Sequence, residues 1–323
     1  MSILVTGAAG FIGARVCQAL LEQDHDVIGI DNLNSYYDVF LKKERLSRLI
    51  SKKNFIFKEV DFEYIDLISL FSSRQLNDVT IVLHFAAQAG VRHSMEAPID
   101  FINTNIKGHV AILEFAKKLV NLRHLIYASS SSVYGRNAEL PFRESDRVDR
   151  PGSVYAASKR AAELMSDCYQ HLYGLPQTGL RFFTVYGPWG RPDMAYFKFA
   201  RAIMRGETLT LYEGKDLARD FTYIDDVVDA VLKILAVPPP SDRSRILNVG
   251  NSSPEAVLHL VTLLERFLNR KASVSVTSRP AADVETTWAS IDAIEQLVGW
   301  KPKITLEEGI NRFSGWFLGC KYT

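Results

Sequence analysis

Apolar runs and amphipathic segments alternate along the first half of the chain. The apolar runs are short, as expected of buried parallel strands, and span residues 3–6, 27–30, 55–60, 79–84, 124–129 and 177–181. The segments between them carry apolar residues at helical spacing and include 39–51, 96–119 and 154–173. Strands that alternate with helices predict a parallel sheet covered by helices on both faces.

The second half of the chain has a less regular pattern, and the elements it predicts are shorter. A helix is expected over 225–236 and a strand over 246–249, with a proline-rich surface loop at 238–241 between them. The chain is therefore expected to be an α/β protein with a doubly wound parallel sheet and a smaller C-terminal cap domain that binds the substrate.

The boundaries of these two domains can also be predicted. The sheet domain is expected over 1–180 and the cap mainly over 181–323, and segments near 216–242 and 284–298 are expected to rejoin the sheet domain. A ligand is expected in the cleft between two such domains.

Composition and charge exclude several classes of protein. Of the 323 residues, 47% are apolar and 23% are charged, as in an ordinary globular protein. The formal net charge is +1 with both signs interspersed, so neither nucleic acid nor a membrane surface is expected as a partner. No apolar run approaches the ~18 residues of a membrane span, and the apolar N-terminus lacks the basic flank of a signal peptide. The three cysteines lie far apart, which favours reduced thiols in a cytoplasmic protein and predicts no metal site.

A glycine-rich motif directly follows the first apolar run. Residues 7–13 have the spacing Gly-x-x-Gly-x-x-Gly, and a helical segment follows them through Leu21. Small residues at this spacing let the backbone turn sharply and approach a pyrophosphate at the helix N-terminus. The candidate cofactor-binding residues of this motif are Gly7, Ala9, Gly10, Phe11, Ile12 and Gly13. The order strand, glycine motif, helix predicts a Rossmann-like dinucleotide-binding domain.

An acidic residue ends the second apolar run. Asp31 stands where a carboxylate accepts hydrogen bonds from the adenosine ribose hydroxyls and repels a 2′-phosphate. Neither Asn32 nor Leu33 carries a positive charge that would compensate. The sequence therefore predicts a preference for NAD over NADP.

Tyr155 and Lys159 are the candidate catalytic pair. They form the only Tyr-x-x-x-Lys of the chain, within a predicted helix, where residues four apart share a face. A fixed positive charge stabilises a phenolate and lowers the pKa of a tyrosine below its usual ~10, so that the tyrosine can accept a proton from a substrate hydroxyl. The alternative is a surface tyrosine beside a solvated lysine, and the glycine motif in the same chain favours the catalytic interpretation.

Longer stretches of the sequence carry a family resemblance. They are the segment 31–38, the serine run 129–132 with the Val-Tyr-Gly that follows it, the stretch 180–193 and the segment 219–226. Together with the glycine motif and the Tyr-Lys pair, they resemble the extended short-chain dehydrogenase/reductase family and, within it, the nucleotide-sugar 4-epimerases. The chain is most similar to the UDP-glucuronate 4-epimerases, along nearly its whole length.

The resemblance implies roles for individual residues. Ser130 resembles the active-site Ser/Thr that hydrogen-bonds the reacting hydroxyl, Tyr155 resembles the base, and Lys159 resembles its partner at the nicotinamide ribose. Further implied cofactor-binding residues are Asp31, Asn32, Asn34, Ser35, Asp61, Phe62, Phe85, Ala86, Ala87, Asn105, Tyr155 and Lys159. Implied substrate-binding residues are Ser130, Ser131, Ser132, Thr184, Arg191, Arg219, Arg279 and Asp283.

One segment departs from the family pattern. Ala282 replaces the usual glycine before Asp283, and Arg279 stands one position before the usual phosphate contact. Arg219, in contrast, stands where the family has its pyrophosphate-contacting arginine.

The resemblance implies a reaction at carbon 4 of a UDP-sugar. Tightly bound NAD⁺ takes a hydride while Tyr155 takes the hydroxyl proton, and return of the hydride to the other face of the 4-keto intermediate gives the 4-epimer. Related dehydratases have Asp-Glu where Ser131 and Ser132 stand, and decarboxylase relatives have an acidic residue in the same loop. Conversion of UDP-glucuronate to UDP-galacturonate is therefore the expected activity.

A uronate substrate sets a further requirement. A 4-keto uronate is a β-keto acid, so an epimerase must hold its carboxylate out of alignment with the ketone. Ser131, Ser132, Thr184 and Arg191 are candidates, and a guanidinium can bind a carboxylate at two points.

Two alternatives stay open from the sequence. One is epimerisation of UDP-glucose and UDP-galactose, or another conversion of a UDP-uronate sugar. The other is an NAD-binding sensor without turnover, which the intact tyrosine and lysine disfavour. The resemblance also implies a homodimer formed through the helices 96–119 and 154–173.

Overall fold

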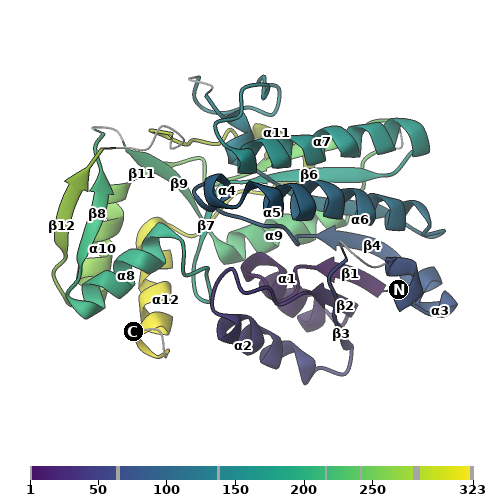
Figure 1. Ribbon diagram of the computed structural model, residues 1–323, viewed down its shortest axis with the longest axis horizontal. Helices are drawn as coiled ribbons and strands as arrows, with labels where there is room; N and C mark the ends of the chain where they lie inside the picture. Colours follow the sequence, from purple (N-terminus) through teal and green to yellow (C-terminus); the bar gives the residue numbers. More distant parts are fainter. Residues whose placement is uncertain are drawn as a thin grey trace. The chain divides into compact units, whose positions relative to one another are not determined.

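A seven-stranded sheet is the framework of the first of two compact units (Figure 1). The computed structural model describes residues 2–62, 66–136, 139–214, 217–240, 242–278 and 284–320. The strand order is β10-β6-β5-β4-β1-β2-β3, and every pairing from β6 across to β3 is parallel. The strands are β1 (Ser2–Thr6), β2 (Asp26–Asp31), β3 (Phe55–Glu59), β4 (Val79–His84), β5 (His124–Ser130), β6 (Gln177–Phe182) and β10 (Arg245–Val249). The expected doubly wound α/β fold is confirmed.

Helices alternate with these strands along the chain (Figure 1). They are α1 (Phe11–Glu22), α2 (Val39–Ile50), α3 (Ser73–Asp78), α4 (His93–Glu96), α5 (Pro98–Ile102), α6 (Gly108–Lys117), α7 (Val154–Tyr173) and α9 (Ile224–Leu235), with short 3₁₀ turns η1 (Leu67–Leu70) and η3 (Ser131–Tyr134). α7 has the bounds that the sequence predicts. Its N-cap Ser153 accepts a hydrogen bond from the Ala156 N–H, and Gly174 ends it in the left-handed conformation.

The predicted helix over 96–119 is divided in the structure. α4 and α5 are separated at Ala97, and the π-helical turn η2 (Asn103–Lys107) stands between α5 and α6. Pro98 explains the first break, because proline has no N–H to continue a helix and is tolerated at its first position. π-turns are frequent at functional sites, and this one carries Asn105.

The strand order reverses at the centre of the sheet. β1 lies between β2 and β4, so the chain builds the sheet outward first on one side and then on the other. Ile3, Leu4 and Val5 of this central strand are fully buried. In sheets of this kind, ligands bind at the carboxyl ends of the strands beside such a reversal.

The second unit contains two small sheets. Their strand orders are β11-β9-β7 and β12-β8. The elements of this unit are β7 (Thr184–Tyr186), α8 (Ala195–Arg205), β8 (Thr208–Tyr212), β9 (Ala218–Tyr223), β11 (Pro254–Ala256), α10 (Val257–Leu268), β12 (Ser273–Thr277), α11 (Asp292–Val298) and α12 (Leu306–Leu318). The expectation of shorter elements is wrong for its helices. α10 and α12 have 12 and 13 residues, because each buries an apolar stripe in the core of this unit.

The chain crosses between the units several times. The first unit comprises Met1–Asn137, Arg147–Phe182 and Val228–Leu247, and the second comprises Ala138–Asp146, Phe183–Val227 and Asn248–Thr323. The segment 284–298 therefore does not rejoin the first unit as expected. Backbone hydrogen bonds tie it to the second unit, from the Ala218 N–H to the Glu285 carbonyl and from the Thr287 N–H to the Ala218 carbonyl.

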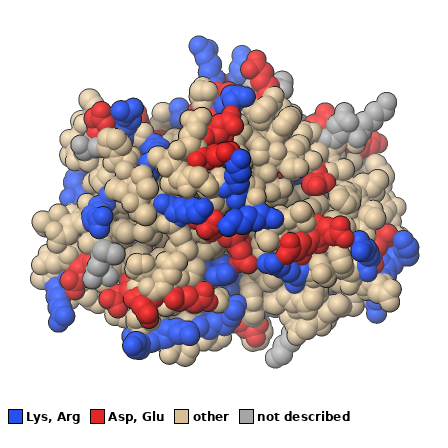
Figure 2. All heavy atoms as spheres, turned by 180° about the vertical axis from the view of Figure 1, so that it is seen from behind, with Lys and Arg blue, Asp and Glu red and all other residues tan. Residues whose placement is uncertain are grey.

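The surface carries charges of both signs. On the face shown in Figure 2, lysine and arginine side chains are interspersed with aspartate and glutamate side chains. Within the described part of the chain, no helix combines the length and the apolar character needed to span a membrane.

Candidate cofactor-binding and catalytic site

The glycine motif forms a tight turn between β1 and α1. The Gly10 N–H donates to the Gly7 carbonyl at 2.9 Å, and Gly7 has a φ of +74°. A Cβ on Gly7 would lie 2.7 Å from the backbone nitrogen of Ala86, and one on Gly13 would lie 2.1 Å from the Gly7 carbonyl oxygen. The turn is therefore closed to larger residues at both positions. α1 starts with Gly10 as N-cap and no side chain caps its first turn, which fits a pyrophosphate at this helix end.

Asp31 ties the end of β2 to this turn. Its buried carboxylate accepts hydrogen bonds from the backbone N–H groups of Ala9 (3.0 Å) and Leu33 (2.9 Å). The Lys42 ammonium, on α2, is buried and lies 3.9 Å from the same carboxylate. Burial lowers the pKa of Lys42, and the charge of Asp31 opposes this shift.

Lys42 and Arg45 are the residues that the sequence analysis missed at this end of the site. The sequence offers no positive charge directly after Asp31, but α2 brings in two buried ones. Arg45 donates from Nη1 to the Ala9 carbonyl at 3.0 Å and to the Tyr37 hydroxyl at 2.7 Å. Their place on the buried stripe of α2 is a signal that could have found them, since a lysine or arginine is rarely fully buried without a partner.

Polar side chains continue from Asp31 along the carboxyl ends of the strands. Asn32 donates to Asp61 at 3.1 Å, and Asn34 accepts from Lys42 at 2.9 Å and donates to Gln88 at 3.2 Å. Asn105 then accepts from the Gln88 N–H at 2.8 Å and donates to the Gln88 carbonyl and to the Ser158 hydroxyl, each at 2.9 Å. These bonds join the loop after β2, the loop after β4 and α7.

The other predicted cofactor residues differ in exposure. Phe85, Ala86 and Ala87 are half-buried in the loop after β4, and Ser35 is exposed. The side chain of Phe62 is part of the hydrophobic core and meets the His84 ring edge-on, with centroids 5.9 Å apart. Only the backbone of Phe62 is therefore available for the expected contact with a cofactor.

Tyr155 and Lys159 lie on one face of the first two turns of α7. Tyr155 is half-buried, and its ring meets the edge of Phe101 at a centroid distance of 6.0 Å. Lys159 is buried and donates to the Ala128 carbonyl of β5 at 3.0 Å. Burial lowers the pKa of Lys159 to about 7, and the carboxylate of Glu163 opposes this shift. The expectation of a fixed positive charge is thus too simple, because the charge depends on the groups around the ammonium.

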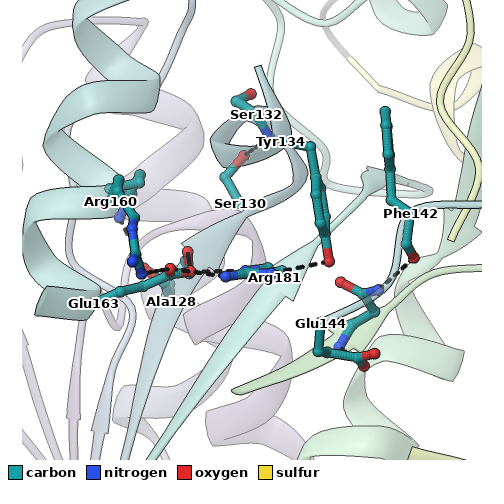
Figure 3. Close-up of polar contacts among 12 residues, drawn as sticks. Ala128, Ser130, Ser132, Tyr134, Phe142, Glu144, Arg160, Glu163 and Arg181 are labelled. Atoms are coloured by element: carbon teal, nitrogen blue, oxygen red, sulfur yellow. Dashed lines mark hydrogen bonds and ion pairs between the residues drawn. The ribbon is translucent and has the colours of Figure 1, made fainter. Parts of the chain in front are cut away.

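Ser130 ends β5 beside this helix (Figure 3). Its hydroxyl accepts a hydrogen bond from the Ser132 N–H at 3.1 Å and so caps the turn η3. Ser131 and Ser132 are half-buried in that turn. Ser130 thus ends β5, Lys159 reaches the Ala128 carbonyl of the same strand, and Tyr155 lies one helical turn before Lys159 on α7. A hydroxyl, a phenol and an ammonium are the groups needed for proton transfer with a substrate hydroxyl.

Two of the predicted substrate-binding residues of the second unit, Arg191 and Arg219, have partners within it. Arg191 binds Asp193 at two points, with 3.0 Å between Nε and Oδ1. Arg219 donates to the carbonyls of Ala218 (2.9 Å) and Glu285 (2.8 Å). Thr184 is half-buried at the start of β7. Arg279 and Asp283 lie outside the described residues.

The Arg191–Asp193 pair was not anticipated from the sequence. A carboxylate of the chain itself takes the two-point contact that was expected for a substrate carboxylate. A Cβ on Gly190 would overlap the Tyr196 hydroxyl, so the loop that presents Arg191 is closely packed. Among the residues that the structure describes, no three His, Cys, Asp or Glu side chains gather as a metal site would require.

The parallel sheet, the glycine turn and the Tyr-Lys helix together define a dinucleotide-dependent enzyme of the tyrosine–lysine type. Comparison with known proteins gives the family. The model of the NAD dependent epimerase/dehydratase family matches residues 3–250, and the chain belongs to this family.

Similar proteins match along nearly the full chain. UDP-glucuronate 4-epimerase 1 of Arabidopsis thaliana is 46% identical over 332 residues, which cover 98% of this chain and 77% of that protein. The crystal structure of UDP-glucuronic acid 4-epimerase from Bacillus cereus in complex with UDP-glucuronic acid and NAD is 31% identical, with a TM-score of 0.91 and 99% of each chain covered. UDP-glucose 4-epimerase of Thermotoga maritima, crystallised with UDP-glucose, is 30% identical, with a TM-score of 0.87 and 99% of each chain covered.

Proposed function

We propose that this protein is an NAD-dependent isomerase that interconverts UDP-glucuronate and UDP-galacturonate by epimerisation at carbon 4. The observation that carries the proposal is the presence of Ser130 at the end of β5 and of Tyr155 and Lys159 on α7, which contacts that strand through Lys159, in a chain that matches UDP-glucuronate 4-epimerases along most of its length. NAD is the cofactor, and it fits the closed glycine turn and the uncapped start of α1.

The chemistry of the proposed reaction follows from these three side chains. Tyr155 takes the proton of the carbon-4 hydroxyl, and Ser130 hydrogen-bonds the same oxygen. Lys159, held by the Ala128 carbonyl, stabilises the phenolate when it is charged. Bound NAD⁺ supplies reversible hydride acceptance at carbon 4. Because the proton and the hydride are both returned, the reaction needs no net oxidant or reductant.

The two compact units have separate proposed roles. The first unit, with the glycine turn and Asp31, binds NAD. The second unit, with Thr184, Arg191 and Arg219, contributes contacts to the nucleotide-sugar, and Arg279 and Asp283 belong to the same proposed set. Ser131 and Ser132 are the proposed carboxylate-binding residues of the first unit.

One observation favours a second candidate function. Because Asp193 already neutralises Arg191, the demand for a substrate carboxylate at this arginine is weaker than the sequence alone suggested. A neutral UDP-sugar, as in UDP-glucose/UDP-galactose 4-epimerases, is therefore the alternative substrate. Incubation of the purified protein with UDP-glucuronate and, separately, with UDP-glucose, followed by NMR of the products, decides between them. No conversion of either sugar by protein that binds NAD would support a sensor without turnover.

A homodimer is part of the proposal. α5 and α7 expose apolar side chains at Ile99 (62%), Leu164 (49%) and Leu172 (64%), an arrangement that favours burial against a second copy. α5 packs against α7, so these residues belong to neighbouring helices. The location proposed for the protein is the cytoplasm, which its free cysteines Cys17, Cys168 and Cys320 fit.

A further inference from the structure

A buried ion pair joins Glu163 of α7 to Arg181 of β6 (Figure 3). Glu163 stands one helical turn after Lys159 on α7, and its side chain is 1% exposed. Its Oε1 accepts from Arg181 Nε at 2.9 Å, and its Oε2 accepts from Arg181 Nη2 at 3.0 Å. Arg181, near the end of β6, is itself 2% exposed. A charge pair buried this deeply is costly to desolvate and adds little net stability, so stability alone does not account for it.

The pair reaches both ends of the serine segment that carries Ser130. The Ser129 hydroxyl donates to Glu163 Oε1 at 2.6 Å. At the other end, Arg181 Nη1 donates to the Tyr134 hydroxyl at 3.0 Å, and the guanidinium lies 4.8 Å from the centre of the Tyr134 ring. Ser129 directly precedes Ser130, and Tyr134 ends the turn η3 that Ser130 caps. The ion pair therefore joins the serine segment to the helix that carries Tyr155 and Lys159.

We infer that Glu163 and Arg181 are positioning residues for the reaction, which fix Ser130 relative to Tyr155 and keep a negative charge beside Lys159. The inference rests on the proposed function only for the identity of the reacting groups. In the family-based interpretation these two residues had no role.

The other groups that face Lys159 leave Glu163 as its source of negative charge. His84 of β4 and His109 of α6 both interact with the ammonium electrostatically. Burial lowers the pKa of both, to about 3 for His109, so both are neutral near pH 7. Glu163 is the group whose charge raises the pKa of Lys159, while Arg181 and Arg160 hold Glu163 in its ionised form by hydrogen bonding.

The test uses Glu163→Gln, which keeps the shape of the side chain and removes its charge. Arg160→Gln is the matched control. Arg160 is partly exposed, and its Nη1 donates to the same carboxylate at 3.0 Å. The protein is studied with its bound NAD. Tyr155 is titrated through its phenolate absorbance, as the difference between each variant and the same variant with Tyr155→Phe.

The sign of the titration shift separates positioning from a simple charge effect. Removing a carboxylate lowers the pKa of a nearby phenol directly, whereas loss of the Lys159 charge raises it. In Glu163→Gln we expect the apparent pKa of Tyr155 to rise by about one unit, and kcat for UDP-glucuronate to fall at least about tenfold with little change in KM. Arg160→Gln should change both much less, because Arg181 and Ser129 still bind the Glu163 carboxylate, and Glu163→Asp should restore part of both. An unchanged or lowered pKa of Tyr155 in folded Glu163→Gln would overturn the inference.

A second variant covers the case in which Glu163→Gln does not fold. Tyr134→Phe keeps the ring over Arg181 and removes only the hydroxyl that Arg181 binds. It should fold, retain NAD and lose kcat by about tenfold, because Ser130 is held less firmly. Normal kcat in Tyr134→Phe would overturn the positioning role. The phenol titration needs no sugar, so it tests this inference separately from the proposed function. If the unmutated protein failed to convert UDP-glucuronate, the proposed function would be refuted, and the titration would still decide the inference.

Discussion

Replacement of Asp31 by alanine should change which dinucleotide the protein prefers. The Asp31 carboxylate holds the N–H groups of Ala9 and Leu33 and lies 3.9 Å from the Lys42 ammonium. Without it, the proposed ribose acceptor is lost, the glycine turn and the loop after β2 each lose a hydrogen bond, and the buried lysine loses its counter-charge. NAD should bind more weakly, and a 2′-phosphate should meet a positive charge in place of a negative one.

The size of this change can be worked out from the contacts. A hydrogen bond to a charged group contributes ~1.5–3 kcal/mol. Two unit charges ~4 Å apart interact by about 4 kcal/mol at an effective dielectric constant of ~20, and we take about half of this for a phosphate near Lys42. The two effects together amount to ~3.5 kcal/mol, and each ~1.4 kcal/mol is a factor of ten in affinity. The ratio of NAD to NADP affinity should therefore fall by at least ~10²-fold in Asp31→Ala.

Isothermal titration calorimetry on nucleotide-free protein measures this ratio. The matched control is the double variant Asp31→Ala/Lys42→Met, which lacks the same ribose contacts and also lacks the cation. Its NADP affinity should be weaker than that of Asp31→Ala. Equal affinities of the unmutated protein for NAD and NADP, or an unchanged ratio in Asp31→Ala, would refute the reasoning.

Three further predictions concern the substrate, the stability and the assembly. If Arg191, Thr184 and the η3 serines hold a uronate carboxylate, a neutral sugar leaves these donors unpaired, at a cost of ~1–3 kcal/mol each. The rate of conversion of UDP-glucose should then be at least ~10²-fold lower than that of UDP-glucuronate. Arg191→Ala should reduce this preference and yield a pentose by-product, detected by NMR. Burial holds the pKa of His109 at about 3, below its usual ~6.5, so the unfolded state binds the extra proton and stability is lost as the pH falls below about 6.5. Between pH 6.5 and 5, protonation of this histidine in the unfolded state should lower the free energy of unfolding, measured by urea titration, by ~2 kcal/mol. If His109→Gln lost the same free energy over this range, His109 would not be the cause. Analytical ultracentrifugation should give a dimer for the unmutated protein and a monomer for folded Leu172→Glu, and a monomer in both would rule out the proposed interface.

The sequence predicted the sheet and the helix α7 well because both have strong local signals. The central strands are continuous apolar runs, and α7 combines an amphipathic pattern with a serine N-cap and a glycine stop. The predicted helix 96–119 was too long, because Pro98 and the π-turn around Asn105 interrupt a pattern that stays apolar throughout. The amphipathic helices α10 and α12 were overlooked among the less regular segments of the second half.

The chemistry of the site was predicted in part. A short motif and a family resemblance single out Tyr155, Lys159 and Ser130 as candidates, but the environment of these side chains depends on contacts between distant segments. Burial of Lys159 under β5, which lowers its pKa, cannot be read from its neighbours in the sequence. The same holds for the approach of Lys42 to Asp31. The Arg191–Asp193 pair is local, yet its geometry is set by the folded loop.

The most direct test of the account is product analysis by NMR after incubation with UDP-glucuronate, for the unmutated protein and for Tyr155→Phe. The unmutated protein should form UDP-galacturonate without net reduction of NAD. Tyr155→Phe removes the phenol oxygen and keeps the ring, so it should remain folded with NAD bound while turnover falls by at least ~10²–10⁴-fold. Absence of UDP-galacturonate with the unmutated protein, or near-normal turnover by Tyr155→Phe, would contradict the proposed reaction and its base.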